Sequence, residues 1–330
     1  MKRLLVILVL ASGIFAAWAA ASLLMPETPQ PQTVVTIKPG TTTRQMAREL
    51  ESAGVLQSAF AFRILNVLEG RRTLKAGDYL FEQPATALDI YDRLARGDVI
   101  SVAVVIPEGF NRWEIATALE QAKLCSRDEF LRVVHAETGL VKDVDPAADS
   151  LEGYLFPDTY HLTPSQSPRE IAAAMVQRFR KEASSLGLSG KPDLRRMVIM
   201  ASIVEKETSV PEERALVAGV FENRLARGIA LATDPSVIYA ALLAGKYDGV
   251  IHQSDLDRDS PYNTYRFPGL PPGPIANPGR AALAAAMHPE RSDFLYFVAN
   301  NKGGHNFSRT LEEHNRNVNA YRTGLSKGRR

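Results

Sequence analysis

An uncharged apolar run near the N-terminus constrains the fold of this chain most strongly. The run extends from Leu4 to Met25 and directly follows Lys2 and Arg3. About 20 apolar residues in a helix cross a hydrocarbon core of about 30 Å, and positive residues beside such a helix stay in the cytoplasm. Residues 1–25 are therefore predicted to form a single-pass anchor in the inner (cytoplasmic) membrane. The N-terminus would be cytoplasmic and the remaining chain periplasmic or otherwise extracytoplasmic.

A cleaved signal peptide is the alternative for this segment. Residues 17–22, Ala-Trp-Ala-Ala-Ala-Ser, place small side chains at the spacing of a cleavage site. The apolar run exceeds the usual signal-peptide core of about 7–15 residues, which favours a retained anchor. Residues 26–32 are polar and rich in proline, so they are predicted to form a linker that holds the following domain off the membrane.

The composition of the chain is that of ordinary globular proteins, with room for more than one domain after the anchor. Its 39 basic and 37 acidic residues give a formal net charge of +2, so electrostatics does not favour a nucleic-acid partner. Cys125 is the one cysteine, which excludes an internal disulfide. An exported fold without a disulfide depends on its hydrophobic core.

An internal repeat organises the first half of the chain. Residues 34–39 and 102–107 are both β-rich runs ended by a proline, and matched apolar positions follow each of them. Residues 77–81 have their counterpart at 153–156, so each copy is predicted to run strand, helix, helix, strand and then another helix. Ser58 and Ser126 are predicted to cap the second helix of each copy, since serine accepts a hydrogen bond from the first turn.

These patterns predict an α+β protein with a transmembrane helix, a βααβ module over residues 33–100 and a mixed α/β catalytic domain over residues 101–325. The strand, helix, helix, strand order of the first copy resembles the small LysM module that binds glycans containing N-acetylglucosamine. A structural spacer is an equal alternative for this module.

A helix predicted over residues 194–208 carries an acid at the end of its apolar stripe. At about 100° per residue, Glu205 lies within roughly 40° of the apolar side chains, whereas Glu207 lies on the opposite side of the helix. The apolar residues of the stripe are Leu194, Val198 and Ala201. A carboxyl group beside apolar neighbours favours its protonated form, which a general acid requires. Glu205 is the candidate catalyst, and a salt bridge at the helix C-terminus is the alternative role.

Further candidate residues occur in segments rich in aromatic, acidic and proline residues. Loops that contain tyrosine and asparagine often bind polar ligands such as sugars. Asp234 precedes a proline and is also the simplest cap for the helix that follows. The candidate substrate-binding residues are Glu152, Asp234, Tyr262, Asn263 and His305.

Several catalytic classes lack their signatures in this sequence. There is no His-Glu-x-x-His and no Cys-x-x-Cys, so we expect no metal and no other cofactor. Gly-x-Ser-x-Gly and Ser-x-x-Lys are missing too, which argues against acyl transfer through a serine. A single protonated carboxyl group acting on a polar polymer remains, and outside a bacterial membrane the leading polymer is peptidoglycan.

Five ordered motifs occupy the second half of the chain. They are Ala-Ser-Ile-Val-Glu-Lys-Glu-Thr at 201–208, Glu-Asn-Arg-Leu at 222–225, Thr-Asp-Pro-Ser-Val-Ile-Tyr at 233–239, Tyr-Asn-Thr-Tyr at 262–265 and Gly-Leu-Pro-Pro-Gly-Pro-Ile at 269–275. With these motifs the chain resembles the endolytic murein transglycosylase family (MltG, YceG-like). The resemblance covers essentially the whole chain, and the family's catalytic glutamate falls on Glu205.

The resemblance implies a lytic transglycosylase, a carbon–oxygen lyase of cell-wall biogenesis and degradation. It would cut the bond between N-acetylmuramic acid and N-acetylglucosamine in nascent peptidoglycan, with Glu205 acting first as acid and then as base. The product would carry a 1,6-anhydro-N-acetylmuramic acid end, and the cut would terminate strand elongation. Peptidoglycan synthases are the partners that the resemblance suggests. The alternatives are a lysozyme-like hydrolase that uses the same glutamate with water, and a glycan-binding scaffold without activity.

Overall fold

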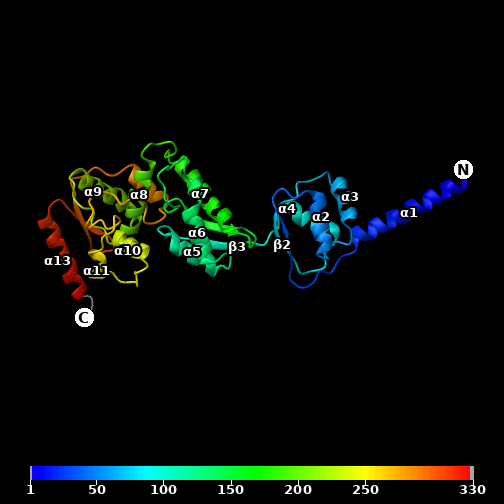
Figure 1. Ribbon diagram of the computed structural model, residues 1–330, viewed down its shortest axis with the longest axis horizontal. Coiled ribbons are helices and arrows are strands. Elements are labelled where there is room, and N and C mark those ends of the chain that lie inside the picture. The colour runs from blue at the N-terminus through cyan, green and yellow to red at the C-terminus, as the bar shows by residue number, and fades with distance from the viewer. Residues whose placement is uncertain (1, 328–330) are drawn as a thin grey trace. The chain divides into compact units, whose positions relative to one another are not determined.

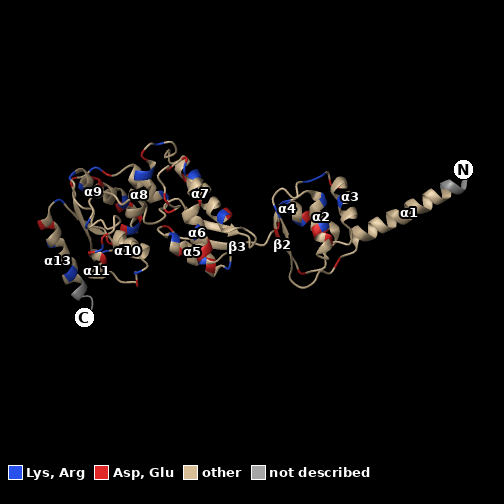
Figure 2. Cartoon of the chain, viewed as in Figure 1, with Lys and Arg blue, Asp and Glu red and all other residues tan. Residues whose placement is uncertain are grey.

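The computed structural model describes residues 2–327 and mixes helices with short strands (Figure 1). The chain divides into two compact units. One comprises Met1–Ala103 with His161–Gln166, and the other comprises Val104–Tyr160 with Ser167–Arg330. Basic and acidic side chains are interspersed along both units, as the balanced composition requires (Figure 2).

The first unit consists of an N-terminal helix and a small module in βααβ order followed by a helix. Its elements are α1 (Lys2–Leu24), β1 (Thr33–Ile37), α2 (Thr43–Ser52), α3 (Ala59–Leu68), β2 (Gly77–Phe81) and α4 (Ala87–Arg96). The strands β1 and β2 pair antiparallel, with Val35 opposite Tyr79. The predicted element order of this copy is therefore present.

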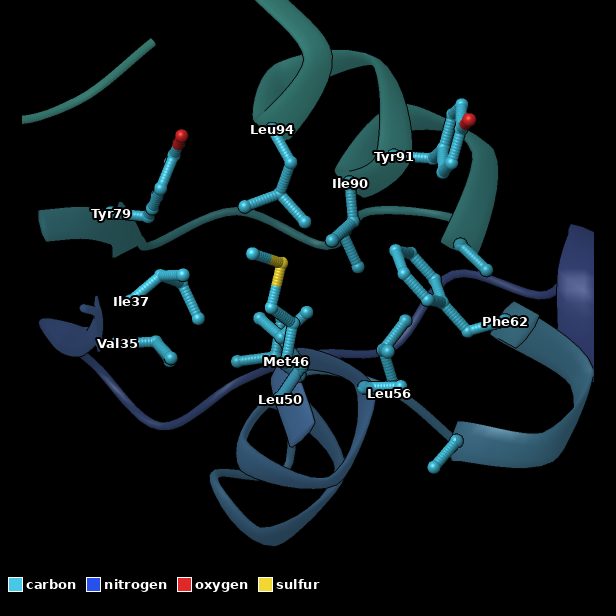
Figure 3. Close-up of a cluster of buried hydrophobic side chains, with 14 of the residues drawn as sticks. Val35, Ile37, Met46, Leu50, Leu56, Phe62, Tyr79, Ile90, Tyr91 and Leu94 are labelled. Carbon is cyan, nitrogen blue, oxygen red and sulfur yellow. The ribbon is translucent and has the colours of Figure 1, made fainter. Parts of the chain in front are cut away.

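Local sequence signals start the helices of the module. Ser58 caps α3 as predicted, by accepting a hydrogen bond from the backbone of Ala61. Thr42 and Thr86 are the N-caps of α2 and α4, and each forms a capping box. In a capping box the side chain of the cap residue accepts from the backbone N–H of the third helical residue, and the side chain of that residue accepts from the backbone N–H of the cap. The apolar faces of strands and helices then meet in one core (Figure 3), which includes the fully buried rings of Phe62, Tyr79 and Tyr91 among others.

No flexible linker separates the helix α1 from the module. Its segment Val6–Leu24 is the one helix in the described chain that is long and apolar enough to cross a membrane. Leu23 packs against the core of the module. The proline-rich segment 26–32, predicted as a linker, is fastened to the module because Glu27 and Ala85 exchange two backbone hydrogen bonds of 3.0 and 3.1 Å.

The second unit contains the remaining elements. These are β3 (Val102–Ile106, which begins in the first unit), α5 (Arg112–Gln121), α6 (Arg127–Ala136), β4 (Asp158–Leu162), α7 (Pro168–Ser185), α8 (Leu194–Glu207), α9 (Arg214–Ala226), α10 (Asp234–Leu243), α11 (Gln253–Leu256), α12 (Arg280–Met287), β5 (Tyr296–Ala299), β6 (His305–Ser308) and α13 (Leu311–Lys327), with 3₁₀ turns at Thr138–Leu140 and Pro211–Glu213. The strands β3 and β4 pair with each other, and β5 pairs with β6.

The second copy of the repeat has the predicted order, but its last strand begins later than expected. Ser126 caps α6 as predicted, whereas residues 153–156 form a turn and the strand is β4. Gly153 has a φ of +88°, and both its N–H and that of Leu155 donate to the side chain of Asn277. These donors are not available to a strand ladder, so the strand starts after them.

The helix predicted over 194–208 is α8, and it lies at the centre of the second unit. It packs against α9, α10 and α12. Leu194, Val198 and Ala201 are buried, which confirms the apolar face predicted for this helix. This packing fixes the position of the last turn, where Glu205 lies.

Candidate active site

Glu205 is held between a cation and a helix N-terminus. Its side chain is 4% exposed. One carboxylate oxygen accepts a hydrogen bond from Nη2 of Arg214 at 3.0 Å, and the other accepts from the backbone N–H of Gly279 at 2.9 Å. Gly279 is the N-cap of α12, where the backbone donors and the helix dipole favour an anion. The salt bridge that was the alternative role for Glu205 is therefore present, next to the predicted apolar face.

A second acid, Glu108, lies beside Glu205. It follows β3, its side chain is 48% exposed, and one of its oxygens is 3.8 Å from Nη2 of the same Arg214. Burial and the charge of Glu205 raise the pKa of Glu108, and Arg214 opposes that rise. A Cβ on Gly279 would lie 1.8 Å from Oε1 of Glu108, so the half-exposed side chain of Glu108 would have to shift to admit a larger residue there. Two carboxyl groups thus share one arginine.

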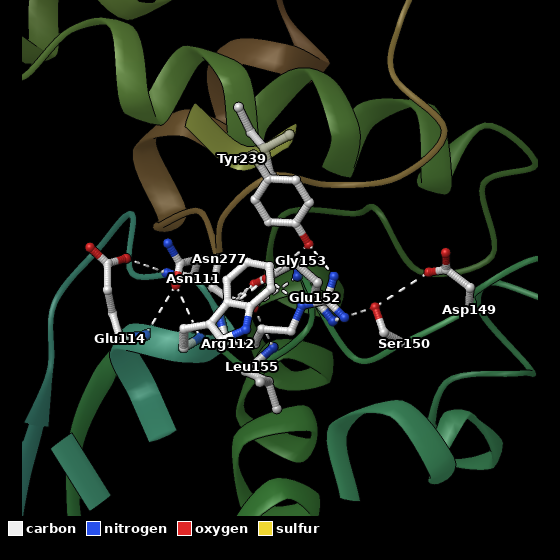
Figure 4. A network of polar contacts seen from close by, with 12 residues as sticks. Asn111, Arg112, Glu114, Asp149, Ser150, Glu152, Gly153, Leu155, Tyr239 and Asn277 are labelled. Atoms are coloured by element: carbon white, nitrogen blue, oxygen red, sulfur yellow. Dashed lines mark hydrogen bonds and ion pairs between the residues drawn. The ribbon is translucent and has the colours of Figure 1, made fainter. Parts of the chain in front are cut away.

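Glu152 lies in a separate network of polar contacts (Figure 4). Its side chain is 1% exposed. Its oxygens accept from the backbone of Arg112 at 3.1 Å, from the Tyr239 hydroxyl at 3.1 Å and from Nδ2 of Asn277 at 2.7 Å. Burial raises the pKa of Glu152 to about 7 against the opposing charge of Arg112. Because its side chain is buried, Glu152 would not contact a substrate itself and could influence one only by positioning Arg112, Tyr239 and Asn277.

Asn277, which we did not single out in the sequence, connects this network to Glu205. Its Oδ1 accepts from the N–H groups of Gly153 and Leu155, and its Nδ2 also donates to the carbonyl of Phe110 at 2.9 Å. Its backbone exchanges hydrogen bonds with the loop after β3. Two residues later, Gly279 donates to Glu205. The buried amide of Asn277 thus positions the main-chain donor that contacts the candidate acid.

A pocket of about 640 Å³ opens next to this arrangement. Aromatic and aliphatic side chains dominate its lining, among them Phe110, Trp113, Tyr239 and Tyr247. Lys206, the residue after Glu205, lines it as well and donates to the carbonyl of Gly109 at 3.2 Å. Aromatic walls with a few polar groups are typical of sites for polar organic ligands. Within residues 2–327, no group of His, Cys, Asp and Glu side chains is arranged to hold a metal ion.

The structure places Tyr262 and Asn263 apart from the carboxylate of Glu205. Tyr262 is buried, and its ring lies 5.0 Å from that of Tyr239, which lines the pocket. Asn263 is fully buried, and its Nδ2 donates to the carbonyls of Leu256 and Arg258 at 2.8 and 3.0 Å. The amide of Asn263 therefore holds its own proline-rich loop.

Asp234 and His305 also have partners other than Glu205. Asp234 is the first residue of α10 and not its cap, since Thr233 occupies that position and the side chain of Asp234 accepts from the Tyr265 hydroxyl at 2.7 Å. His305 lies on β6, with its Nδ1 2.6 Å from a carboxylate oxygen of Glu213. Among the described residues, none of the five weaker candidates is hydrogen-bonded to Glu205, whose partners are Arg214 and Gly279.

Glu207 differs from its expected position on the outside of α8. It is half-buried, and burial together with the negative charge of Asp234 raises its pKa to about 7, while Arg224 opposes the rise. Arg196, on the outside of α8, pairs instead with Glu222 of α9. The charged groups around Glu207, Arg224 of α9 and Asp234 of α10, come from other helices, which the periodicity of α8 alone does not reveal.

The raised pKa of Glu207 predicts how stability depends on pH. Between the ordinary carboxyl pKa of 4.5 and about 7 the folded chain binds more protons than the unfolded chain. The free energy of unfolding should therefore increase as pH falls through this range, by up to about 1.4 kcal/mol per pH unit for one such group. Denaturant unfolding at several pH values measures this slope, which should be smaller in Glu207→Gln. An identical slope in both proteins would contradict the assignment.

Comparisons with known proteins identify the family of this chain. The model of the YceG-like family matches residues 35–320. The endolytic murein transglycosylase of Bacillus subtilis (strain 168) is 32% identical over 320 residues, which span 91% of this chain and 88% of that protein. The protein of the same name from Streptococcus pneumoniae is 30% identical over 86% of this chain, which spans 57% of that longer protein.

A solved structure is similar as well. The 2.6 Å crystal structure of a putative YceG-like protein from Listeria monocytogenes aligns with a TM-score of 0.56 and 33% identity. The alignment covers 86% of this chain and 98% of that chain. The range that the family model spans includes most of both compact units.

Proposed function

The chain belongs to the YceG-like family, and from this membership we propose that it is an endolytic murein transglycosylase that cuts nascent peptidoglycan between N-acetylmuramic acid and N-acetylglucosamine. The observation that carries the proposal is the position of Glu205. This acid is almost fully buried, is held by Arg214 and Gly279, and lies beside the half-exposed Glu108. An aromatic pocket of about 640 Å³, which the neighbouring Lys206 lines, opens next to it.

In the proposed reaction Glu205 works first as an acid and then as a base. Protonated Glu205 donates its proton to the glycosidic oxygen while the bond from that oxygen to C1 of the muramic acid breaks and positive charge develops on the ring. The carboxylate then accepts the proton of the C6 hydroxyl of the same sugar, and that oxygen bonds to C1. No water is consumed. Because the nucleophile belongs to the same ring, a high effective molarity replaces the second carboxylate of ordinary glycosidases.

Glu108 supplies a second carboxyl group beside the candidate acid. Burial and the negative charge of Glu205 raise the pKa of Glu108, so this neighbour tends to keep its proton. A glycan that covers the half-exposed Glu108 removes water from it and strengthens this tendency. Arg214 and the N–H of Gly279 are then in place to stabilise Glu205 when it becomes a carboxylate.

The N-terminal helix supports a location at the membrane surface. We propose that α1 is retained as a single-pass anchor with Lys2 and Arg3 in the cytoplasm, because Leu23 and Trp18 pack against the module that follows. Cutting close to the membrane would end the elongation of nascent strands. The LysM-like module would bind glycan, and peptidoglycan synthases would be partners in the same process.

The mass of the product ends tests the proposed reaction. Digestion of purified glycan strands should give 1,6-anhydro ends, which are one water lighter than the reducing ends of hydrolysis. Glu108→Gln should still give anhydro ends, because the C6 hydroxyl and not a second carboxylate completes the reaction. Reducing ends from the unmodified protein would favour a lysozyme-like hydrolase with Glu108 as its second carboxylate. Glycan binding without any cleavage would favour a scaffold.

A further inference from the structure

The helix α3 is apolar on both of its faces. Phe62 and Leu65 point into the core of the module and are buried. Phe60, Val67 and Leu68 lie outside the core, with 51%, 56% and 72% of their surfaces exposed. A cluster of large exposed apolar side chains marks an interaction site.

The exposed face of α3 continues directly from the helix that is long enough to span a membrane. The ring of Trp18 in α1 lies 6.3 Å from that of Phe60, and Figure 1 shows α3 beside the C-terminal end of α1. Trp18 precedes Leu24, the last residue of α1, by six residues, or about 9 Å at 1.5 Å per residue. Tryptophan of spanning helices favours the membrane–water interface. A retained α1 therefore brings Phe60 to interfacial depth.

The connection between α1 and the module leaves no slack to lift α3 away from the bilayer. Leu23 packs on the module core, and the backbone bridge between Glu27 and Ala85 fastens the proline-rich segment. The module and the end of α1 therefore move together. The position of α1 along the bilayer normal sets how deeply the module enters the bilayer.

A basic pocket borders the apolar face. It has a volume of about 230 Å³, and Phe60 lines it together with Arg44, Arg48, Arg63 and one acid, Glu51, whose carboxylate accepts from the backbone N–H of Ala59. In the described part of the chain none of these three arginines forms an ion pair, and all three are exposed. Arg44 and Arg48 are four residues apart on α2, where like charges repel unless an anion lies between them. A phosphate group fits this charge and the geometry of guanidinium groups.

We propose that the outer face of α2 and α3 binds the surface of the bilayer. Phe60, Val67 and Leu68 enter the interface, and the three arginines hold the phosphate of an anionic phospholipid head group. The module would then lie on the membrane surface. This inference rests on the retained anchor and is independent of the transglycosylase chemistry.

Lipid exposure of a spin label at position 68 tests the proposal. The full-length chain with Cys125→Ser carries the label through Leu68→Cys, or through Glu82→Cys as the control. Glu82 is exposed and follows β2, which Figure 1 shows on the side of this unit away from α1. In vesicles of phosphatidylethanolamine and phosphatidylglycerol, the ratio of oxygen to nickel-complex accessibility should be several-fold higher at position 68 than at 82. Equal ratios would overturn the proposal, and shielding from both reagents would indicate a covering protein instead.

The role of the arginines has its own test with a charge-matched control. Arg44→Gln/Arg48→Gln/Arg63→Gln should lower the accessibility ratio at position 68 several-fold, since each basic residue near an anionic surface contributes to binding. Replacement of phosphatidylglycerol by phosphatidylcholine should have the same effect. The control Lys123→Gln/Arg127→Gln/Arg132→Gln removes equal charge from exposed positions of the other unit and should change nothing. A ratio independent of both the arginines and the lipid would overturn head-group recognition.

Carbonate extraction of the vesicles checks the anchor separately. A full-length chain that washes off would overturn both the anchor and the lipid-bound face. The glycan digestion described above does not depend on that result, so failure of the lipid proposal and failure of the proposed reaction can be told apart.

Discussion

Glu205→Gln is expected to reduce glycan cleavage by about 10²–10⁴-fold, the contribution typical of a general acid, and to leave the fold intact. Glutamine has the volume of glutamate and keeps an oxygen to accept from Arg214 or Gly279, but it carries no proton to donate to the leaving oxygen. Initial rates of anhydro-end formation on purified strands measure the loss. Circular dichroism and thermal unfolding show whether the fold is retained.

The matched control for this experiment is Glu137→Gln. Glu137 forms an exposed ion pair with Arg169, at a distance of 3.0 Å, and such pairs contribute little. This variant should cleave at the rate of the unmodified protein. Full cleavage by Glu205→Gln would exclude Glu205 as the proton donor.

Asn277→Ala is expected to lower the free energy of unfolding of the second unit by about 3–5 kcal/mol, because it breaks a buried polar network. The side chain is fully buried, and its loss leaves the N–H groups of Gly153 and Leu155 without their acceptor and removes one donor each from Phe110 and Glu152. The midpoint of urea unfolding measures the change. At a temperature where the variant is still folded, kcat should fall at least tenfold because the donor at Gly279 is no longer fixed.

Asn263→Ala provides the comparison. Asn263 is equally buried, and its amide also binds backbone groups, but it holds a loop that does not contact Glu205. Its replacement should destabilise the unit while kcat of the folded fraction changes much less. Equal losses of kcat in both variants would show that Asn277 contributes only to stability.

Helix periodicity and capping signals predicted much of the secondary structure. Ser58 and Ser126 cap the helices assigned to them, and the apolar face of α8 is buried as its spacing predicted. These signals are local, because a cap or a stripe depends only on residues within a few turns. The error at residues 153–156 arose where a distant residue, Asn277, takes the N–H groups that a strand would use.

The surroundings of Glu205 could not be predicted in the same way. Arg214, Glu108 and Gly279 reach it from three other elements, and no periodicity in the sequence relates these positions. One signal for Glu108 was present. The second copy of the repeat has one more residue between its proline, Pro107, and its helix cap than the first copy has, and that stretch contains Glu108.

The hydrogen bond from Gly279 to Glu205 has a consequence for how the protein can diverge. Its donor is a main-chain N–H, so no change of side chain elsewhere removes it directly, and only proline at position 279 would delete the hydrogen itself. A larger residue at 279 would instead displace the half-exposed side chain of Glu108. Natural variation in this loop should therefore be limited by the backbone course that keeps this N–H beside Glu205, and proline should be absent at 279.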